Sequence, residues 1–275
     1  MRTTRSEELQ ELAELAVRAL PAGVEEIVLT GSVSRGVADE LSDVEMLVVT
    51  GQLLDREECF EHARSMGLTE LDSWGPPPAP AQHVFGYRAG IPFELIWWPR
   101  AYAEARVAQA RAGAEGATAD ALVHGVPLRT CGLLAGWQEQ LRIYPPEVAA
   151  ARIETAASRW GGFAPAGVLT LTRDGDRVAL QEWLLDATAR VLAIVFAVNG
   201  VWQPTTKRLA ARLAPLAVQP ERLAERLTLT LTEPAARRAL RSMTEIQLET
   251  VLLAPSGPNI DRARGWLAAA LELLW

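Results

Sequence analysis

The chain has few cysteines, no long apolar run and no cluster of basic residues, and each shortage excludes a class of protein. Two cysteines, Cys59 and Cys131, are too few for a disulfide framework, so we expect free thiols in a reducing, cytoplasmic compartment. The apolar run Val191–Val198 is much shorter than the roughly 20 residues of a membrane span, and the segment MRTTRSEELQ lacks the apolar stretch of a signal peptide. The net charge of −7 weighs against a duplex-binding protein, so we expect no nucleic-acid partner.

The composition nevertheless supports a folded protein with a sizeable core. The chain has 275 residues, of which 49% are hydrophobic and 22% are charged. This apolar content excludes a disordered chain, and the length suits one large domain or two of ordinary size. The acidic balance suits a small or cationic substrate.

Apolar spacing divides the chain into a mixed first part and a helical remainder. In the first part we predict helices over residues 6–20 and 53–66, and strands over 26–30, 43–50, 83–88 and 92–98, the last two forming a hairpin across Ala89–Gly90. From Pro99 onward, apolar residues recur at helical spacing over residues 100–112, 147–160, 177–198, 219–231, 234–253 and 258–274. We therefore predict an α/β (α+β) domain with a mixed sheet over residues 1–114, followed by an all-α helical bundle over residues 115–275.

The stretch Leu29–Val49 contains candidate metal-binding and phosphate-binding residues. Side chains alternate along a strand, so Asp43 and Glu45, at the start of an apolar strand, point to one face. Two neighbouring carboxylates repel each other, and a hard divalent metal such as Mg²⁺ takes carboxylate oxygens together with substrate phosphates. Gly31 allows the backbone to approach a phosphate closely, and Ser32 adds a hydroxyl group and an N–H at the same point.

No single part of this pattern is specific. An Asp-x-Glu at the start of a strand is common on solvated faces, and a Gly-Ser pair is a weaker signal still. The ordered set is more informative, because a third acid, Glu94, lies within the apolar strand 92–98, where a carboxylate needs a partner. A P-loop is excluded: Gly31–Gly36 has its glycine spacing, but Val37 and Ala38 stand where that motif requires Lys and then Ser or Thr.

The ordered set of GSVSRG, SDVEMLVV and a later acidic strand resembles the nucleotidyltransferases of the DNA polymerase β superfamily. The SDVEM segment is especially similar to that of antibiotic nucleotidyltransferases such as kanamycin nucleotidyltransferase. The resemblance covers residues 25–98 and continues weakly through Arg142–Pro145 and Asn199–Leu209. It implies a catalytic nucleotidyltransferase domain over residues 1–114 and a helical substrate-binding domain over residues 115–275. It also implies two Mg²⁺ ions and a nucleoside triphosphate as co-substrate, with pyrophosphate as the leaving group.

The resemblance, carried over residue by residue, assigns roles to these side chains. It implies that the metal ligands are Asp43, Glu45 and Glu94, and that the nucleotide-binding residues include Gly31, Ser32 and Arg35. Lys207 is a further candidate for the phosphates, because it follows Pro204 and two threonines at a predicted helix start, where backbone N–H groups favour anions. A solvated basic face explains Lys207 equally well.

The general base is the least defined role. Kanamycin nucleotidyltransferase has a glutamate in its helical domain followed four residues later by a lysine, and residues 147–167 contain no such pair. Glu94 is one candidate, and Glu182 or Asp186 on the predicted helix 177–198 is the other. Glu182, Asp186 and Arg190 form one polar stripe, which faces either the cleft or the solvent, with an Asp186–Arg190 ion pair in the second case. We favour the cleft, because the rest of that helix is apolar.

These observations predict an Mg²⁺-dependent enzyme that moves a nucleoside monophosphate, AMP from ATP, to a hydroxyl group of a small molecule. An aminoglycoside or other antibiotic-like acceptor is our first choice, which would give the protein a role in antibiotic resistance. Two alternatives remain: a toxin-like transferase that modifies tRNA or protein, and a non-catalytic nucleotide-binding relative.

Two apolar features of the sequence also need an explanation. The apolar spacing of Leu267, Leu271 and Leu274 needs a cover, either from the same chain or from a second subunit, and the resemblance favours a homodimer. Tryptophans such as Trp97, Trp98 and Trp202 are candidates for stacking on a base, although core packing explains them more simply.

Overall fold

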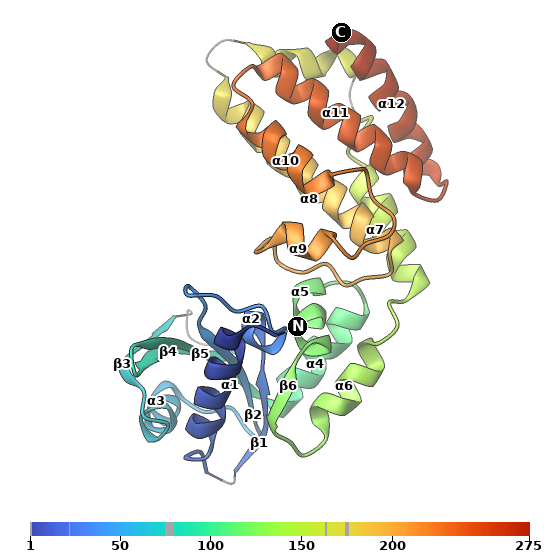
Figure 1. The fold of residues 1–275 in the computed structure, drawn as a ribbon. Coiled ribbons are helices and arrows are strands. Elements are labelled where there is room, and N and C mark those ends of the chain that lie inside the picture. The colour runs from blue at the N-terminus through green and yellow to red at the C-terminus, as the bar shows by residue number, and fades with distance from the viewer. Residues whose placement is uncertain (1, 22, 75–79, 163, 174–175) are drawn as a thin grey trace. The chain divides into compact units, whose positions relative to one another are not determined.

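The computed structural model describes residues 2–21, 23–74, 80–162, 164–173 and 176–275. Two compact units divide the chain, Met1–Ile143 and Tyr144–Trp275. The first unit contains α1 Thr4–Val17, β1 Val24–Leu29, α2 Gly31–Ser34, β2 Val44–Thr50, α3 Arg56–Ser65, β3 Thr69–Trp74, β4 Gln82–Arg88, β5 Ile91–Pro99, α4 Arg100–Arg111, α5 Gly116–Val123, β6 Val126–Arg129 and α6 Leu133–Leu141 (Figure 1). The second contains α7 Pro146–Ala157, the 3₁₀ helix η1 Pro165–Thr172, α8 Arg177–Val198, α9 Leu209–Leu213, α10 Leu223–Thr232, α11 Ala236–Leu253 and α12 Pro258–Leu274.

The first unit is built around one six-stranded sheet with the strand order β3-β4-β5-β2-β1-β6. β2 and β5 are parallel, and the other neighbouring strands are antiparallel, so the sheet is mixed as the sequence predicted. The predicted hairpin joins β4 to β5 across Ala89 and Gly90, whose φ angles are 50° and 76°. Positive φ at both central residues is typical of the tight turns that suit the twist of a hairpin.

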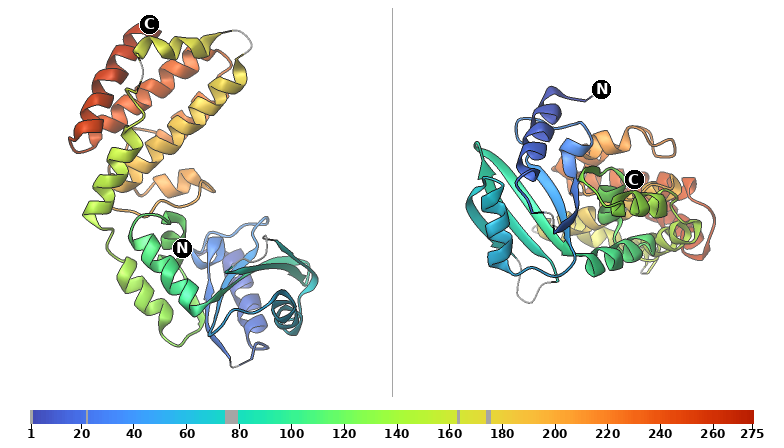
Figure 2. Two further views of the ribbon diagram at one scale, coloured as in Figure 1. Left: turned by 180° about the vertical axis from the view of Figure 1, so that it is seen from behind. Right: turned by 90° about the horizontal axis from the view of Figure 1, so that it is seen from below.

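Different helices cover the two faces of this sheet (Figure 2). α1 and α3 pack on one face, where Ile27, Met46 and Leu95 are fully buried. α4 and α6 contact the other face through β5, β2 and β1. Because side chains alternate along a strand, Glu45 and Glu94, the chain neighbours of Met46 and Leu95, point to the α4 and α6 face.

The strands predicted from apolar alternation are confirmed within two residues at each end for β1, β2, β4 and β5. The sequence did not reveal the two edge strands. The sequence of β3 is largely polar because most of its residues are exposed. Glu70, within β3, has a φ of 53°. β6 has only four residues, one of which is Pro127. A short strand that contains proline is typical of a sheet edge and gives little apolar alternation.

The division between the units differs from the predicted boundary after residue 114, because it falls after Ile143. Residues 115–143 contain β6, which pairs with β1 in the sheet. The fully buried Glu26 of β1 also holds this segment, since its Oε2 accepts hydrogen bonds from the N–H groups of Cys131 and Leu133 at 3.0 and 3.1 Å. The helical spacing of apolar residues after Pro99 therefore begins within the first unit, so its start does not mark the boundary between the two units.

The second unit is helical, as predicted, and has its own apolar core. The long helix α8 supplies much of that core, including Leu184, Val191 and Ile194. On α12, Leu267 and Leu274 are buried in the same core. Helices of the same chain therefore cover these two leucines, whereas Trp275 is exposed, and a homodimer stays a prediction. Within the described residues, no helix is both long and apolar enough to span a membrane.

Candidate active site

Two neighbouring parallel strands bring three acidic side chains together. In the register of β2 and β5, Glu45 lies directly opposite Glu94. Asp43 precedes Glu45 by two residues and projects to the same face. Each residue offers one carboxylate oxygen, and these oxygens lie within 4.8 Å of one another. All three residues are half-buried. We call Asp43, Glu45 and Glu94 the acidic triad; they are the three acids that the sequence pattern singled out.

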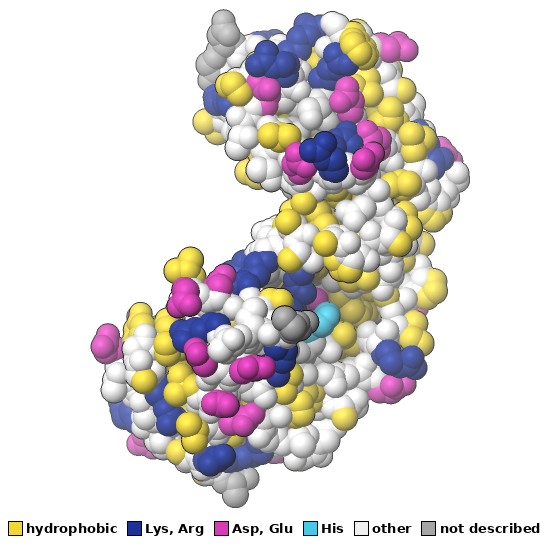
Figure 3. Space-filling view, in the orientation of Figure 1, with side chains coloured by type: hydrophobic (Ala, Val, Ile, Leu, Met, Phe, Trp, Pro, Cys, Tyr) yellow, Lys and Arg dark blue, Asp and Glu magenta, His cyan; other side chains and the backbone are white. Residues whose placement is uncertain are grey.

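The donor chemistry of the acidic triad fits a hard divalent cation. Three carboxylates this close repel one another, and a cation between them offsets the repulsion. Mg²⁺ is bound by carboxylates together with water and substrate phosphates, and a pair of such ions lies about 3.5–4 Å apart in two-metal sites. On the face shown in Figure 3, acidic and basic side chains are interspersed.

Gly31 lies against the carboxylate of Glu45. Its φ of 68° is in the left-handed region, and a Cβ at this position would overlap Glu45 Oε2. The preceding residue, Thr30, donates its backbone N–H to the carbonyl oxygen of Glu45 at 2.9 Å. Glycine is therefore required here for two reasons, the backbone conformation and the space that Glu45 occupies. The two residues predicted to bind phosphate, Gly31 and the half-buried Ser32, thus begin a turn beside the acidic triad.

A compact turn fixes the chain just before Asp43. Ser42 Oγ donates to the carboxylate of Asp39 at 2.9 Å, and it accepts a hydrogen bond from the N–H of Asp39 at 2.9 Å. The N–H of Leu41 also donates to Asp39 Oδ1 at 3.1 Å. Such side-chain-to-backbone bonds stabilise turns. They set the point at which β2 begins, and with it the position of Asp43.

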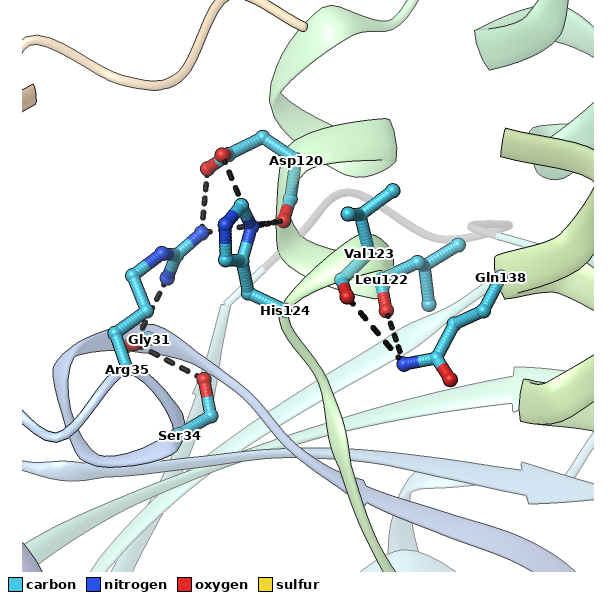
Figure 4. A network of polar contacts seen from close by, with 8 residues as sticks. All are labelled: Gly31, Ser34, Arg35, Asp120, Leu122, Val123, His124 and Gln138. Atoms are coloured by element: carbon cyan, nitrogen blue, oxygen red, sulfur yellow. Dashed lines mark hydrogen bonds and ion pairs between the residues drawn. The ribbon is translucent and has the colours of Figure 1, made fainter. Parts of the chain in front are cut away.

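Arg35 lies in a polar network that links the Gly31 turn to α5 (Figure 4). Its guanidinium donates to the carbonyl oxygens of Gly31 at 2.7 Å and Asp120 at 3.3 Å, and it pairs with the Asp120 carboxylate. The Arg35 and Asp120 side chains are only 12% and 6% exposed. His124 adds a contact of 2.9 Å from Nδ1 to the carbonyl oxygen of Asp120. Arg35 therefore links the Gly31 turn to α5, a role that the sequence did not suggest. Its contact with phosphates stays a prediction.

His83, which has no metal-ligand spacing in the sequence, is a neighbour of the acidic triad in the structure. Its Nδ1 lies 3.5 Å from Glu94 Oε1. The strand β4 places His83 opposite Ile96 and places Phe85 opposite Glu94. Diagonal neighbours of this kind are within reach of aromatic and long side chains. The predicted hairpin across Ala89–Gly90 already implies this register, so the sequence contained a signal that pointed to His83.

The structure places Lys207, the only lysine of the chain, in the second unit. It is exposed and lies in the turn that precedes α9, close to the helix start that the sequence predicted. An exposed basic side chain is compatible with either role proposed for it, so its contact with phosphates stays a prediction.

Two residues of the polar stripe of α8, Glu182 and Asp186, are exposed. Asp186 accepts hydrogen bonds from Arg190 at 2.7 and 2.8 Å. These bonds hold the pKa of Asp186 below its ordinary value. α8 has an exposed side that also contains Val178 and Leu185, and the orientation of this side toward the cleft stays a prediction. A lowered pKa makes Asp186 a poorer general base.

The tryptophans considered for base stacking are buried. Trp97 and Trp98 are 1% and 9% exposed, and Trp202 is 6% exposed. Trp202 packs against Tyr144 with a distance of 4.4 Å between ring centroids. Core packing, the simpler of the two expectations, therefore accounts for these three side chains.

Comparisons with known proteins find no matching family model and no matching curated protein. Solved structures do resemble the chain. One is a nucleotidyltransferase-like protein from Exiguobacterium sibiricum 255-15, with 12% identity, a TM-score of 0.42, and coverage of 95% of this chain and 90% of that one. Another is Cid1 in complex with its short product ApU, with 11% identity, a TM-score of 0.30, and coverage of 99% and 89%. With TM-scores below 0.5, these similarities add no weight to any activity, and the residues of the acidic triad carry the inference.

Proposed function

We propose that this chain is a divalent-metal-dependent nucleotidyltransferase, which moves a nucleoside monophosphate from a nucleoside triphosphate to a hydroxyl group and releases pyrophosphate. The observation that carries this proposal is the acidic triad, whose carboxylate oxygens lie within 4.8 Å of one another beside the Gly31 turn. Nucleotidyl transfer displaces pyrophosphate from phosphorus, and negative charge accumulates on the phosphate oxygens. A centre that gathers cations next to a phosphate-binding turn is suited to that reaction.

The protein contributes a rigid set of ligands to this reaction. Asp43 and Glu45 lie along one strand edge, and Glu94 projects from the adjacent strand in register with Glu45. Both strands are central in the sheet, which fixes the ligands before substrate binds. Mg²⁺, when bound there, supplies charge stabilisation at the phosphates and lowers the pKa of an acceptor hydroxyl.

The triphosphate is assigned to the turn beside the acidic triad. Gly31 has no side chain to keep a phosphate away from the backbone, and Ser32 offers a hydroxyl group. Arg35 holds the Gly31 carbonyl oxygen at 2.7 Å and so keeps the turn in place. Lys207 is our proposal for a further phosphate contact from the helical unit.

The proposed acceptor is the hydroxyl group of a small molecule, with ATP as the nucleotide donor. The net charge of −7 favours a cationic acceptor such as an aminoglycoside, which would make the protein an antibiotic-resistance enzyme. Glu94 and Glu182 are the proposed candidates for the general base. Glu94 would act from within the acidic triad, and Glu182 from the exposed stripe of α8.

The experiment that tests this function combines the purified chain with Mg²⁺, each of the four nucleoside triphosphates and a panel of acceptors. The panel contains aminoglycosides, other hydroxyl-bearing antibiotics, tRNA and a protein mixture. We expect pyrophosphate release that depends on one acceptor class, with a nucleoside monophosphate added to that acceptor by mass spectrometry. Asp43→Asn provides the matched control, because it removes one negative charge and keeps the side-chain shape.

The same panel separates the alternatives. Labelling of tRNA or protein, with none of the small molecules, would refute the proposed acceptor class and retain the chemistry. Triphosphate binding without pyrophosphate release for any acceptor would refute the enzymatic proposal and would favour a nucleotide-binding protein.

A further inference from the structure

Two of the triad carboxylates differ in what supports them. Glu45 has the Gly31 backbone packed against its carboxylate, so its position is restricted by contact. Beside the Glu94 carboxylate lies the imidazole of His83, at 3.5 Å from Nδ1 to Oε1. Carboxylates that bind metals are themselves usually oriented by hydrogen bonds from neighbouring groups.

The environment of the His83 ring leaves one polar atom without a partner. Nδ1 is buried, and it makes no hydrogen bond with any described residue. A buried polar atom without a hydrogen bond lowers stability, so each such atom needs a specific explanation. The closest charged group to Nδ1 is the Glu94 carboxylate, at the outer limit of hydrogen-bond distance.

The strands and a neighbouring ring hold His83 in this position. Trp74, the last residue of β3, lies opposite His83 in the register of β3 and β4. Its ring packs on the imidazole with 4.7 Å between centroids and 44° between planes. β4 in turn pairs with β5 along its whole length, which sets the diagonal approach of His83 to Glu94. The imidazole is therefore placed by backbone pairing on one side and by an aromatic contact on the other.

We propose that His83 is the positioning residue for Glu94, donating a hydrogen bond from Nδ1–H to Glu94 Oε1 when the acidic triad binds its cation. This inference rests on the proposed function, because it assigns His83 to the metal site of that enzyme. The bond leaves Oε2 of Glu94 directed to the cation and satisfies the buried Nδ1. Trp74 contributes by holding the ring in the orientation that the bond requires.

The test is the affinity of the purified chain for Mn²⁺, measured by electron paramagnetic resonance in the absence of nucleotide. His83→Phe keeps an aromatic ring against Trp74 and removes the donor, whereas His83→Asn places an amide N–H near the position of Nδ1. We expect Mn²⁺ binding to weaken about 10–100-fold in His83→Phe, the usual effect of losing a group that orients a metal ligand. His83→Asn should retain most of the affinity.

A matched control separates this effect from general damage. His62, which stacks on Trp97 at 5.4 Å between centroids, offers a second histidine-to-phenylalanine change in the same unit. Trp97 is buried in the core formed with α1 and α3, so His62→Phe should leave Mn²⁺ binding unchanged. Circular dichroism of all variants shows whether each is folded. Where His83→Phe does not fold, His83→Gln takes its place, because its amide lies near the position of Nε2 and not of Nδ1, and it should lose the affinity that His83→Asn retains.

Three results would contradict the proposal in distinguishable ways. Equal Mn²⁺ affinity in wild type and folded His83→Phe would overturn the role of His83 and leave the proposed function intact. A directly coordinated nitrogen in the spin-echo spectrum of bound Mn²⁺, lost in His83→Phe, would make His83 a ligand rather than a positioning residue. Binding in wild type that Asp43→Asn does not weaken would show that Mn²⁺ binds elsewhere, and the metal site of the proposed function would fail with it.

Discussion

Replacement of Gly31 by alanine tests how closely the glycine turn and the acidic triad depend on each other. The φ of 68° places this residue in the left-handed region, where a Cβ costs roughly 1–2 kcal/mol. The new Cβ would also overlap Glu45 Oε2, so the Glu45 side chain must leave its rotamer, at about 0.5–1.5 kcal/mol. We therefore expect Gly31→Ala to destabilise the first unit by about 1.5–3.5 kcal/mol.

Gly90 provides the matched control for this substitution. It has a φ of 76°, close to that of Gly31, but a Cβ there would meet nothing within 4 Å. Gly90→Ala therefore carries the backbone cost alone. The difference between the two variants isolates the overlap with Glu45. In a Glu45→Ala background the overlap disappears, and Gly31→Ala should then cost no more than Gly90→Ala.

Hydrogen exchange of the β1 and β2 amides, read by mass spectrometry, reports the free energy of opening in this part of the sheet. The same samples are tested for Mn²⁺ binding, which should weaken in Gly31→Ala and stay unchanged in Gly90→Ala. Equal destabilisation by the two substitutions, with Mn²⁺ binding retained in both, would refute the close contact between Gly31 and Glu45.

Further predictions concern the triad, α8 and the two thiols. Asp43→Asn or Glu45→Gln should lower turnover by at least about three orders of magnitude, because each removes a ligand where charge develops; circular dichroism should show a retained fold, and near-normal turnover would contradict the assignment. Because Arg190 lowers the pKa of Asp186, that pair stabilises the chain above the ordinary carboxyl pKa and loses its contribution as pH falls. Asp186 is half exposed, so Asp186→Asn should lower the free energy of unfolding in urea at pH 7 by at most about 1 kcal/mol. The same substitution should leave the acidic limb of the pH–rate profile unchanged. Loss of that limb would make Asp186 the base. Burial raises the pKa of the Cys59 thiol to about 12, so iodoacetamide at pH 8 should label the exposed Cys131 alone in the native chain, and rapid labelling of Cys59 would contradict its burial.

The central strands and the triad were predictable because local pattern and function coincide in them. Short apolar runs marked β2 and β5, and the spacing of Asp43 and Glu45 placed both on one face. The parallel pairing that sets Glu45 opposite Glu94 was not contained in the pattern, because it joins segments separated by α3, β3 and β4. The edge strands were missed because a largely exposed strand such as β3 has no buried face to reveal it.

The polar partners of the site illustrate where prediction from sequence ends. Arg35 and Asp120 are 85 residues apart, and no local pattern connects an arginine after one helix with an acid on another. His83 is the opposite case. The two-residue turn at Ala89–Gly90 fixes the hairpin register, and that register alone places His83 diagonally from Glu94. On α8 the spacing of Asp186 and Arg190 did reveal their ion pair, which the structure contains.

The most direct test of the central claim compares two labelled triphosphates in one reaction. ATP carrying ³²P at the α-phosphate or at the γ-phosphate is incubated with the chain, Mg²⁺ and an acceptor identified from the panel. Nucleotidyl transfer predicts that the α label moves to the acceptor and the γ label leaves in pyrophosphate, and that both products disappear in Asp43→Asn. Transfer of the γ label to the acceptor, or equal product formation by wild type and Asp43→Asn, would contradict a nucleotidyltransferase centred on the acidic triad.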